Sequence, residues 1–375
     1  MTRAFSLYLD LLRFAAAMVV FLGHMANRPF TEAPAWGFMS RYPGVAVTLF
    51  FVLSGYVISY VSQGRENSWR PYGAARLSRL YSVVAVGLLL TFVLDAAGMR
   101  ANPEFYGIRN VMWKPPSWDG YAASFFFVNE FQVFGFQGIS PGSNGPYWSL
   151  SFEATYYALA GLVMFSSPLV WVPAGIVLLG MAGKTITALA PIWLLGFLIQ
   201  RHQGRLRLGS RMALVLLVGS AAAIIASPSL VPYLPNLNFG MMFPWGRGHP
   251  NRWLSSDYFV AVMFAIHLVS ARQLCSERLR IDENVSALIR WAGSLTFPLY
   301  CFHYPAICFF AAVSVWPKTA LSNAAFIATG TLAIVVILTP ACERLKDLMR
   351  GLLLGSAALS KPSVRPGDRE ARQLP

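Results

Sequence analysis

Three ionisable side chains interrupt an apolar stretch near the start of the chain, "LDLLRFAAAMVVFLGHM" at residues 9–25. Asp10 and Arg13 are three residues apart, which makes them neighbours on a helix. His24 follows Arg13 by 11 residues, about three helical turns, so all three side chains share one stripe. Placing such groups in a bilayer costs several kcal/mol, and this cost makes them candidates for function. The structural alternative is an ion pair between Asp10 and Arg13, with His24 at the membrane interface.

A second set of polar side chains lies in "NGPYWSLSFEATYYAL", residues 144–159. Glu153 is about two helical turns into an apolar segment, and we expect it at the same membrane depth as His24. A carboxylate can orient an imidazole and raise its basicity, as in catalytic triads. We therefore interpret Glu153 as a partner for His24, and the alternative is a protonated, structural glutamic acid.

Three further motifs place polar residues inside or next to apolar segments. Ser54 and Gly55 in "GVAVTLFFVLSGYVIS" form either a packing notch between helices or a polar point within a span. Arg76 and Arg79 in "RPYGAARLSRLY" are three residues apart, and two arginines on one helical face can bind a phosphate. Their alternative role is to anchor the cytoplasmic end of a span. His303 in "SLTFPLYCFHYP" is either a packing residue or part of a polar path.

The elements that must position these residues are membrane helices. Of the 375 residues, 56% are hydrophobic and 12% are charged, whereas a soluble domain usually carries about 25% charged residues. Apolar runs of roughly 20 residues recur along the chain, which predicts an all-α, polytopic membrane bundle of about ten transmembrane helices. The expected spans are residues 5–26, 44–62, 78–98, 147–165, 168–183, 185–200, 211–227, 256–272, 290–314 and 320–340.

Charge decides the number of spans. An eleventh span at 120–136 would place the arginine-rich segment 201–211 on the outer side of the membrane. With ten spans, 20 of the 30 Lys and Arg residues face the cytoplasm, nine face outside and Arg13 lies within the membrane. Because Lys and Arg are retained on the cytoplasmic side, we predict ten spans in the cytoplasmic (inner) membrane, with both termini cytoplasmic. Two aromatic-rich outer segments, 99–146 and 228–255, either cover a substrate cavity or anchor the protein at the interface.

The remaining composition narrows the class of protein. The net charge of +14 lies in short loops between spans, so topology accounts for it, and membrane lipid rather than nucleic acid is the expected partner. The four cysteines and five histidines form no Cys-x-x-Cys or His-x-x-x-His pair, and we therefore expect no metal. We divide the chain into a membrane domain, residues 1–342, and a basic cytoplasmic tail, residues 343–375.

Taken in this order, the motifs resemble those of the acyltransferase-3 family of bacterial integral-membrane O-acyltransferases. The opening stretch is similar to the family's first motif, in which ten residues separate an arginine from a histidine, as they do Arg13 from His24. "FFVLSGYVIS", "ARLSRLY", "WSLSFE" and "FPLYCFHYP" resemble the later motifs, and the match covers about residues 5–310. The chain departs from the family pattern at Leu11, where glycine is frequent, and at Ala154, where a second glutamate is frequent. The arginine motif lacks its usual following proline.

The resemblance implies a ten-helix domain that transfers an acyl group, commonly acetyl from acetyl-CoA, to a hydroxyl of a glycan or related acceptor. It also implies that His24 is catalytic and that Arg76 and Arg79 are associated with the donor. On this basis we expect His24 to act as the general base. Arg76 and Arg79, together with Arg13, would hold the CoA phosphates, and the pantetheine arm would pass Ser54.

Several features of this mechanism stay open. The candidates for stabilising the oxyanion are Arg13, Trp148, Ser149 and Ser151, and a covalent acyl-enzyme is as compatible with the sequence as direct transfer. A proton-coupled transporter or a lipid or glycan flippase is the alternative from another class, because intramembrane Arg, His and Glu suit a carrier. That alternative predicts inverted repeats and paired broken helices, which are not evident in the sequence. A third possibility is a scaffold that binds acyl-CoA without turnover.

Overall fold

A computed structural model describes residues 1–32, 37–64, 66–107, 117–135, 138–206, 208–235, 254–275 and 281–355. Helices and turns make up these residues, with no β-strand among them. The helices that concern the predicted spans are α1 (Arg3–Met25), α2 (Pro43–Ser62), α3 (Trp69–Ala101), α6 (Trp148–Phe165), α7 (Pro168–Ala182), α8 (Lys184–Arg201), α9 (Ser210–Leu230), α10 (Leu254–Leu274), α11 (Glu283–Val313) and α12 (Leu321–Leu354). Each of the ten predicted spans coincides with one of these helices.

Seven helices in the described part of the chain are long and apolar enough to cross a membrane: α1, α2, α3, α9, α10, α11 and α12. A helix rises about 1.5 Å per residue, so about 20 residues cover the hydrocarbon core. The protein is thus an all-helical, multi-pass membrane protein. Ten spans with both termini in the cytoplasm would also require α6, α7 and α8 to cross, and this count and topology stay a prediction.

Apart from the ends of α3, α9 and α10, the predicted outer segments 99–146 and 228–255 hold only short helices where they are described. The rejected eleventh span at 120–136 contains α5 (Trp118–Phe125), whose eight residues reach about 12 Å and cannot cross a bilayer. The short helix α4 (Pro103–Gly107) precedes it. Of the predicted outer loop 228–255, residues 236–253 lie outside the described residues, as do residues 356–375 of the predicted tail. Helix α12 runs without interruption through the predicted domain boundary after residue 342.

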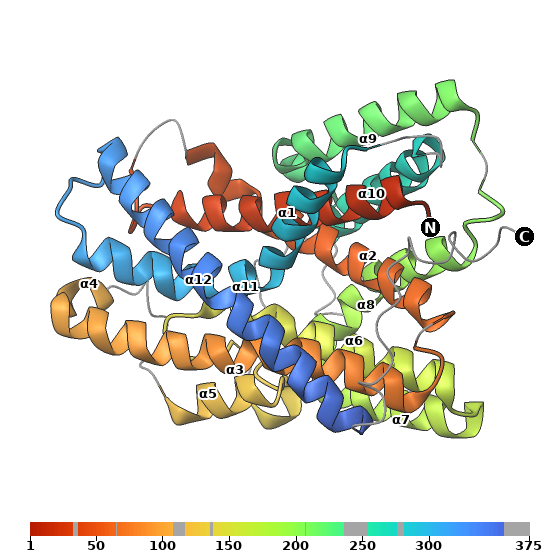
Figure 1. The fold of residues 1–375 in the computed structure, drawn as a ribbon, viewed down its shortest axis with the longest axis horizontal. Helices are drawn as coiled ribbons and strands as arrows, with labels where there is room; N and C mark the ends of the chain where they lie inside the picture. Colours follow the sequence, from red (N-terminus) through yellow and green to blue (C-terminus); the bar gives the residue numbers. More distant parts are fainter. Residues whose placement is uncertain are drawn as a thin grey trace, which may run out of the picture.

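Helix α11 lies at the centre of the bundle and packs against α1, α3 and α12. Figure 1 shows α3 and α12 side by side, whereas α9 lies at the periphery and packs against α10. The outer face of α9 is apolar and exposed, as expected for a helix that faces lipid. Its exposed side chains include Met212, Leu214, Val215, Val218 and Ile225.

Two glycines permit the close contact between α2 and α8. A Cβ atom added to Gly55 would lie 2.0 Å from the carbonyl oxygen of Trp193, and one added to Gly196 would lie 1.9 Å from that of Val52. Any side chain at either position would therefore force the two backbones apart. Gly55 thus serves as a packing notch, whereas its neighbour Ser54 faces the interior of the bundle.

Hydrogen bonds to α3 and α11 fix the turn that precedes α6. The Ser143 amide and hydroxyl donate to the Asp95 carboxylate over 2.8 and 2.7 Å. The Asn144 side-chain amide donates to the Cys301 carbonyl oxygen over 2.9 Å and to the Thr91 hydroxyl over 3.1 Å. Because these polar groups are buried, their pairing holds the turn firmly. The bonds determine where α6 begins and therefore where its polar side chains lie.

Candidate active site

The polar stripe of α1 faces α11. A Cβ atom on Gly293 of α11 would lie 3.1 Å from the Asp10 Cβ. About three to four turns further along the two helices, the His24 ring stacks on His303, with ring centroids 5.3 Å apart, and meets the Tyr304 ring edge-on at 5.2 Å. The stripe predicted from the spacing of Asp10, Arg13 and His24 thus lies on the side of α1 that packs against α11.

A cavity of about 700 Å³, its opening included, lies between α1, α2, α3, α6 and α11. It extends along α2 from Val47 to Ile58, a distance of about 16 Å on a helix. Its charged lining residues are Arg13, Arg76, Arg79 and Glu153, and its other lining residues are Val47, Phe50, Phe51, Leu53, Ser54, Val57, Ile58, Ser149, Leu150, Tyr157, Thr296, Phe297 and Tyr300. An elongated apolar cavity with a few charged groups suits a ligand that has an anionic head and a long arm.

The three arginines of the cavity are held in different ways. Arg13 lies 3.6 Å from Asp10, one turn away on α1. Arg76 donates from Nη2 to both oxygens of Glu66, each at 2.8 Å. Arg79 has its guanidinium carbon 5.8 Å from the centroid of the Phe297 ring. The cavity therefore concentrates positive charge, with each cation in a distinct environment.

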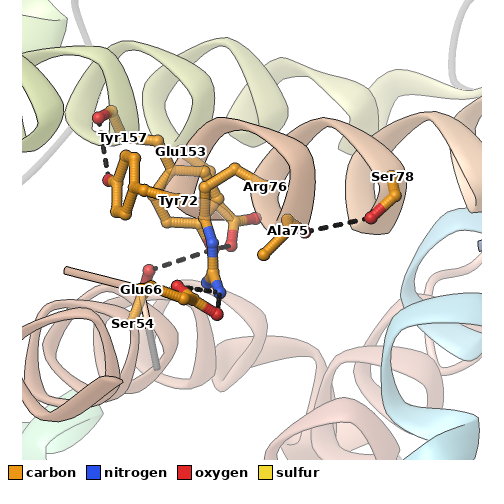
Figure 2. Close-up of polar contacts among 8 residues, drawn as sticks. All are labelled: Ser54, Glu66, Tyr72, Ala75, Arg76, Ser78, Glu153 and Tyr157. Atoms are coloured by element: carbon orange, nitrogen blue, oxygen red, sulfur yellow. Dashed lines mark hydrogen bonds and ion pairs between the residues drawn. The ribbon is translucent and has the colours of Figure 1, made fainter. Parts of the chain in front are cut away.

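Glu153 is fixed within the cavity by a chain of hydrogen bonds across three helices. The Tyr157 hydroxyl, one turn along α6, donates to the Glu153 carboxylate. Ser54 donates to the Tyr157 oxygen over 3.5 Å and accepts from the indole N–H of Trp193 over 3.1 Å. Figure 2 shows how Ser54, Glu153 and Tyr157 lie beside the Arg76–Glu66 pair. The serine of the Ser-Gly motif thus belongs to the site, whereas the glycine serves helix packing.

Tyr300 connects this cavity with the two stacked histidines. It lines the cavity, and its hydroxyl lies 2.6 Å from the Ser149 oxygen and donates to the Pro146 carbonyl over 3.1 Å. Its ring centroid lies 6.0 Å from that of His303. His24 is not among the lining residues of this cavity. The rings of Tyr300 and His303 therefore separate the cavity from His24.

His303 is the more enclosed of the two histidines. It is fully buried, and its Nδ1 lies 2.8 Å from the Tyr300 carbonyl oxygen and 3.0 Å from that of Leu299. Because a carbonyl only accepts, Nδ1 carries the hydrogen, and in the neutral ring Nε2 holds the lone pair. Nε2 is buried without a hydrogen-bond partner among the described residues. His24 is half-buried.

The structure brings some of the predicted site residues together and separates others. Glu153 lies with the arginines and Tyr157, whereas the aromatic neighbours of His24 are His303 and Tyr304. The cavity thus holds the charged residues of the predicted site, and His24 belongs to a separate aromatic cluster.

Two residues of the "WSLSFE" motif lie away from the cavity lining. The Ser151 hydroxyl is fully buried and donates to Asn129 over 2.6 Å. The Trp148 ring packs edge-on against Phe152, with centroids 5.1 Å apart. Among the residues proposed for the oxyanion, Arg13 and Ser149 are therefore the ones that line the cavity.

Sequence reasoning missed Glu66, Tyr157 and Tyr300. Tyr157 follows Glu153 by four residues and Tyr300 precedes His303 by three, which are the spacings of neighbours on a helix. These two tyrosines were therefore within reach of a pattern search. Glu66 lies in the connection between α2 and α3, and no periodic signal marks its approach to Arg76.

Comparison with known proteins decides the class of this membrane protein. A family model described as an acyltransferase domain, type 3, matches residues 6–340. This chain belongs to the acyltransferase-3 family. The acyltransferase is also similar to acyltransferase MdmB from Streptomyces mycarofaciens, with 27% identity over 150 residues, which are 39% of this chain and 36% of that protein. The chain thus covers about a third of that relative's length. No solved structure matches the acyltransferase.

Proposed function

We propose that this membrane acyltransferase transfers an acyl group, expected to be acetyl, from acyl-CoA to a hydroxyl of a glycan or related acceptor. We further propose that it works in the cytoplasmic membrane, with His24 as the general base. The observation that supports this most is the cavity, which carries three arginines and extends to Tyr300, next to the two histidines.

In this proposal the charged part of the cavity receives the donor. The CoA phosphates are attracted by Arg79 and Arg13, with Arg76 in the same wall, because guanidinium groups match phosphate geometry. The pantetheine arm then follows α2 past Ser54 and brings the thioester towards Tyr300. Most side chains that line this path are apolar, and a site that keeps water out limits hydrolysis of the thioester.

The transfer step moves one proton and exchanges one bond. His24 takes the proton of the acceptor hydroxyl as that oxygen attacks the thioester carbonyl. A carbon–oxygen bond forms, the carbon–sulfur bond breaks, and the proton passes from the imidazolium to the departing thiolate. The acceptor approaches from the side of His24 that the bundle leaves exposed, and Tyr300 and His303 move aside or admit the thioester between them.

Ser149 and Arg13 supply the groups that favour the tetrahedral intermediate. Both line the cavity, and hydrogen-bond donors aimed at a developing oxyanion contribute strongly in a site that excludes water. Glu153, fixed by Tyr157, acts within the cavity, where it limits the net positive charge and guides the donor towards Tyr300.

The experiment uses the purified full chain in lipid nanodiscs with acetyl-CoA labelled on the acetyl group. Release of CoA that depends on an added glycan acceptor, together with label on that acceptor, is the expected result. Movement of intact acetyl-CoA or glycan across a vesicle membrane without bond cleavage would instead show a transporter or flippase. Tight binding of acetyl-CoA without turnover, with glycan fractions from the native envelope present, would show a scaffold. Either of these two results would overturn the proposal.

A further inference from the structure

The two arginines of the "ARLSRLY" motif differ in how accessible their charge is. Arg76 is 8% exposed, and both oxygens of Glu66 lie 2.8 Å from its Nη2. Arg79, one turn further along α3, is half-buried. Among the described residues, no carboxylate lies within ion-pair distance of Arg79. Of the two guanidinium groups, only that of Arg76 has a carboxylate partner among the described residues.

Aromatic rings complete the enclosure of Arg76. Its guanidinium carbon lies 5.8 Å from the centroid of the Tyr72 ring and 5.5 Å from that of Tyr157. The Tyr72 hydroxyl donates to the Tyr157 carbonyl oxygen over 2.9 Å, and the Tyr157 hydroxyl donates to Glu153. Arg76 is therefore part of the packing that positions Glu153 (Figure 2). One donor of Arg76, the Nε–H, is buried without a partner among the described residues.

Glu66 is itself enclosed, although it lies in a connection between helices. It is 6% exposed, and charged residues are rarely buried to this extent unless they are paired. A carboxylate and a guanidinium in contact partly cancel each other's field, and the cancellation becomes more complete as the distance from the pair grows. A phosphate that enters the cavity is then attracted by Arg79 and only weakly by the Arg76–Glu66 pair.

We propose that Glu66 is a positioning residue of the donor site, which fixes Arg76 in the cavity wall and cancels its charge, so that Arg79 binds the anionic head of the donor. This inference rests on the proposed function, because it assigns unequal roles to the arginines that receive acyl-CoA. It predicts that removing either charge alone changes donor affinity, in opposite directions, whereas removing both together leaves it nearly unchanged.

A double-mutant cycle on the full chain in nanodiscs tests this interdependence. The variants are Glu66→Gln, Arg76→Gln and the two combined, and the readouts are KM and kcat for acetyl-CoA together with the Kd of CoA. Arg211→Gln, at an exposed position at the start of α9, is the matched control for loss of one positive charge. Thermal unfolding checks that each variant is folded. The combined variant is the one most certain to fold, because it leaves no buried charge unpaired.

The expected pattern is strongly non-additive. Glu66→Gln lowers KM for acetyl-CoA by about threefold to tenfold, because it exposes the charge of Arg76, and Arg76→Gln raises KM by about tenfold, because it leaves an unpaired carboxylate beside the phosphates. The combined variant returns KM and Kd to within about twofold of the parent.

Two results would overturn the inference. A combined variant whose KM stays about tenfold above the parent would show that Arg76 itself binds the phosphates. A Glu66→Gln variant whose KM equals that of the parent would show that Glu66 serves folding alone. These failures are distinct from failure of the proposed function, in which the parent protein neither binds CoA nor releases it in the presence of an acceptor.

Discussion

The two ends of the polar stripe on α1 have different neighbours: charged side chains at one end and aromatic rings at the other. Around Arg13 the cavity carries charged side chains: Arg13 lies near Asp10, Arg76 contacts Glu66, Glu153 accepts from Tyr157, and Arg79 has no ion pair among the described residues. Around His24 the neighbours are the rings of His303 and Tyr304, with no carboxylate among these ring contacts. The first region is suited to holding an anion, whereas the second places two imidazole rings among aromatic side chains.

Under the proposed function, donor binding and proton transfer lie in separate regions of one membrane domain. A charged cavity attracts a polyanionic donor but is a poor environment for an imidazole that must change its charge during each turnover. The rings of Tyr300 and His303 separate the two regions. We therefore expect substitutions at the arginine end to change mainly donor affinity and those at the histidine end to change mainly the rate of transfer.

The largest expected effect belongs to His24. Replacing it by glutamine removes the proposed base, and general-base catalysis typically contributes about 10²–10⁴-fold. We expect kcat to fall by this amount while KM for acetyl-CoA changes by less than about threefold. The measurement is initial-rate kinetics of acceptor-dependent CoA release, with His202→Gln at an exposed position as the control. A His24→Gln variant that retains the parent kcat would show that the histidine end of the stripe does not supply the base, and the two regions would then not differ in function as proposed.

Replacing Arg79 should have the second-largest effect, and it should change KM for acetyl-CoA rather than kcat. A hydrogen bond to a charged group is worth about 1.5–3 kcal/mol, so Arg79→Gln should raise KM for acetyl-CoA by about tenfold to a hundredfold. Arg79→Lys should recover part of this loss, because it keeps the charge but not the forked geometry. Measuring KM at two ionic strengths sharpens the test. The parent KM should rise with salt more steeply than that of Arg79→Gln, and equal salt dependence would contradict the role of Arg79.

A smaller effect is expected from Tyr157. Tyr157→Phe keeps the ring but removes the hydroxyl that Glu153 and Ser54 share. The loss of one buried hydrogen bond costs about 1 kcal/mol, so kcat/KM should fall by about fivefold, as measured in the same release assay. Tyr60→Phe, on the exposed side of α2, is the matched control. If the two phenylalanine variants behave alike, the fixed position of Glu153 is irrelevant to turnover.

The smallest predicted difference separates two serines of one motif. Ser149→Ala removes the partner of the Tyr300 hydroxyl at the cavity, and a fall in kcat of about threefold is expected from one weakened contact. Ser151→Ala removes a bond to Asn129 away from the cavity lining, so it should lower the melting temperature by about 2–4 °C and leave kcat unchanged. Kinetics and thermal unfolding of both variants decide the matter, and a lower kcat for Ser151→Ala would place that residue in the active site.

The sequence was most informative about features that depend on residues close together along the chain, such as the helices and the side chains that share one helical face. Apolar runs marked helices, and the 11-residue spacing of Arg13 and His24 set both on one face, which in the structure meets α11. These inferences depend only on helical periodicity and on the cost of burying charge. The number of membrane crossings depends in addition on the short helices α6, α7 and α8, whose length and hydropathy do not decide it.

Contacts between helices were beyond the reach of pattern analysis. Nothing in the spacing shows that Glu153 faces the arginines, that Glu66 reaches Arg76, or that Ser54 lines the cavity. Such contacts follow from which helices pack together, and this depends on shape along whole interfaces. They also separate the charged cavity from the two stacked histidines, so this separation became visible only in three dimensions.

The most direct test is a cryo-electron microscopy structure of the acyltransferase in nanodiscs with a non-cleavable thioether analogue of acetyl-CoA. The account predicts density in the cavity between α1, α2, α3, α6 and α11, with phosphates against Arg79 and the acyl end beside Tyr300. An analogue bound outside this cavity, or bound in it with the phosphates beside Tyr300, would contradict the account.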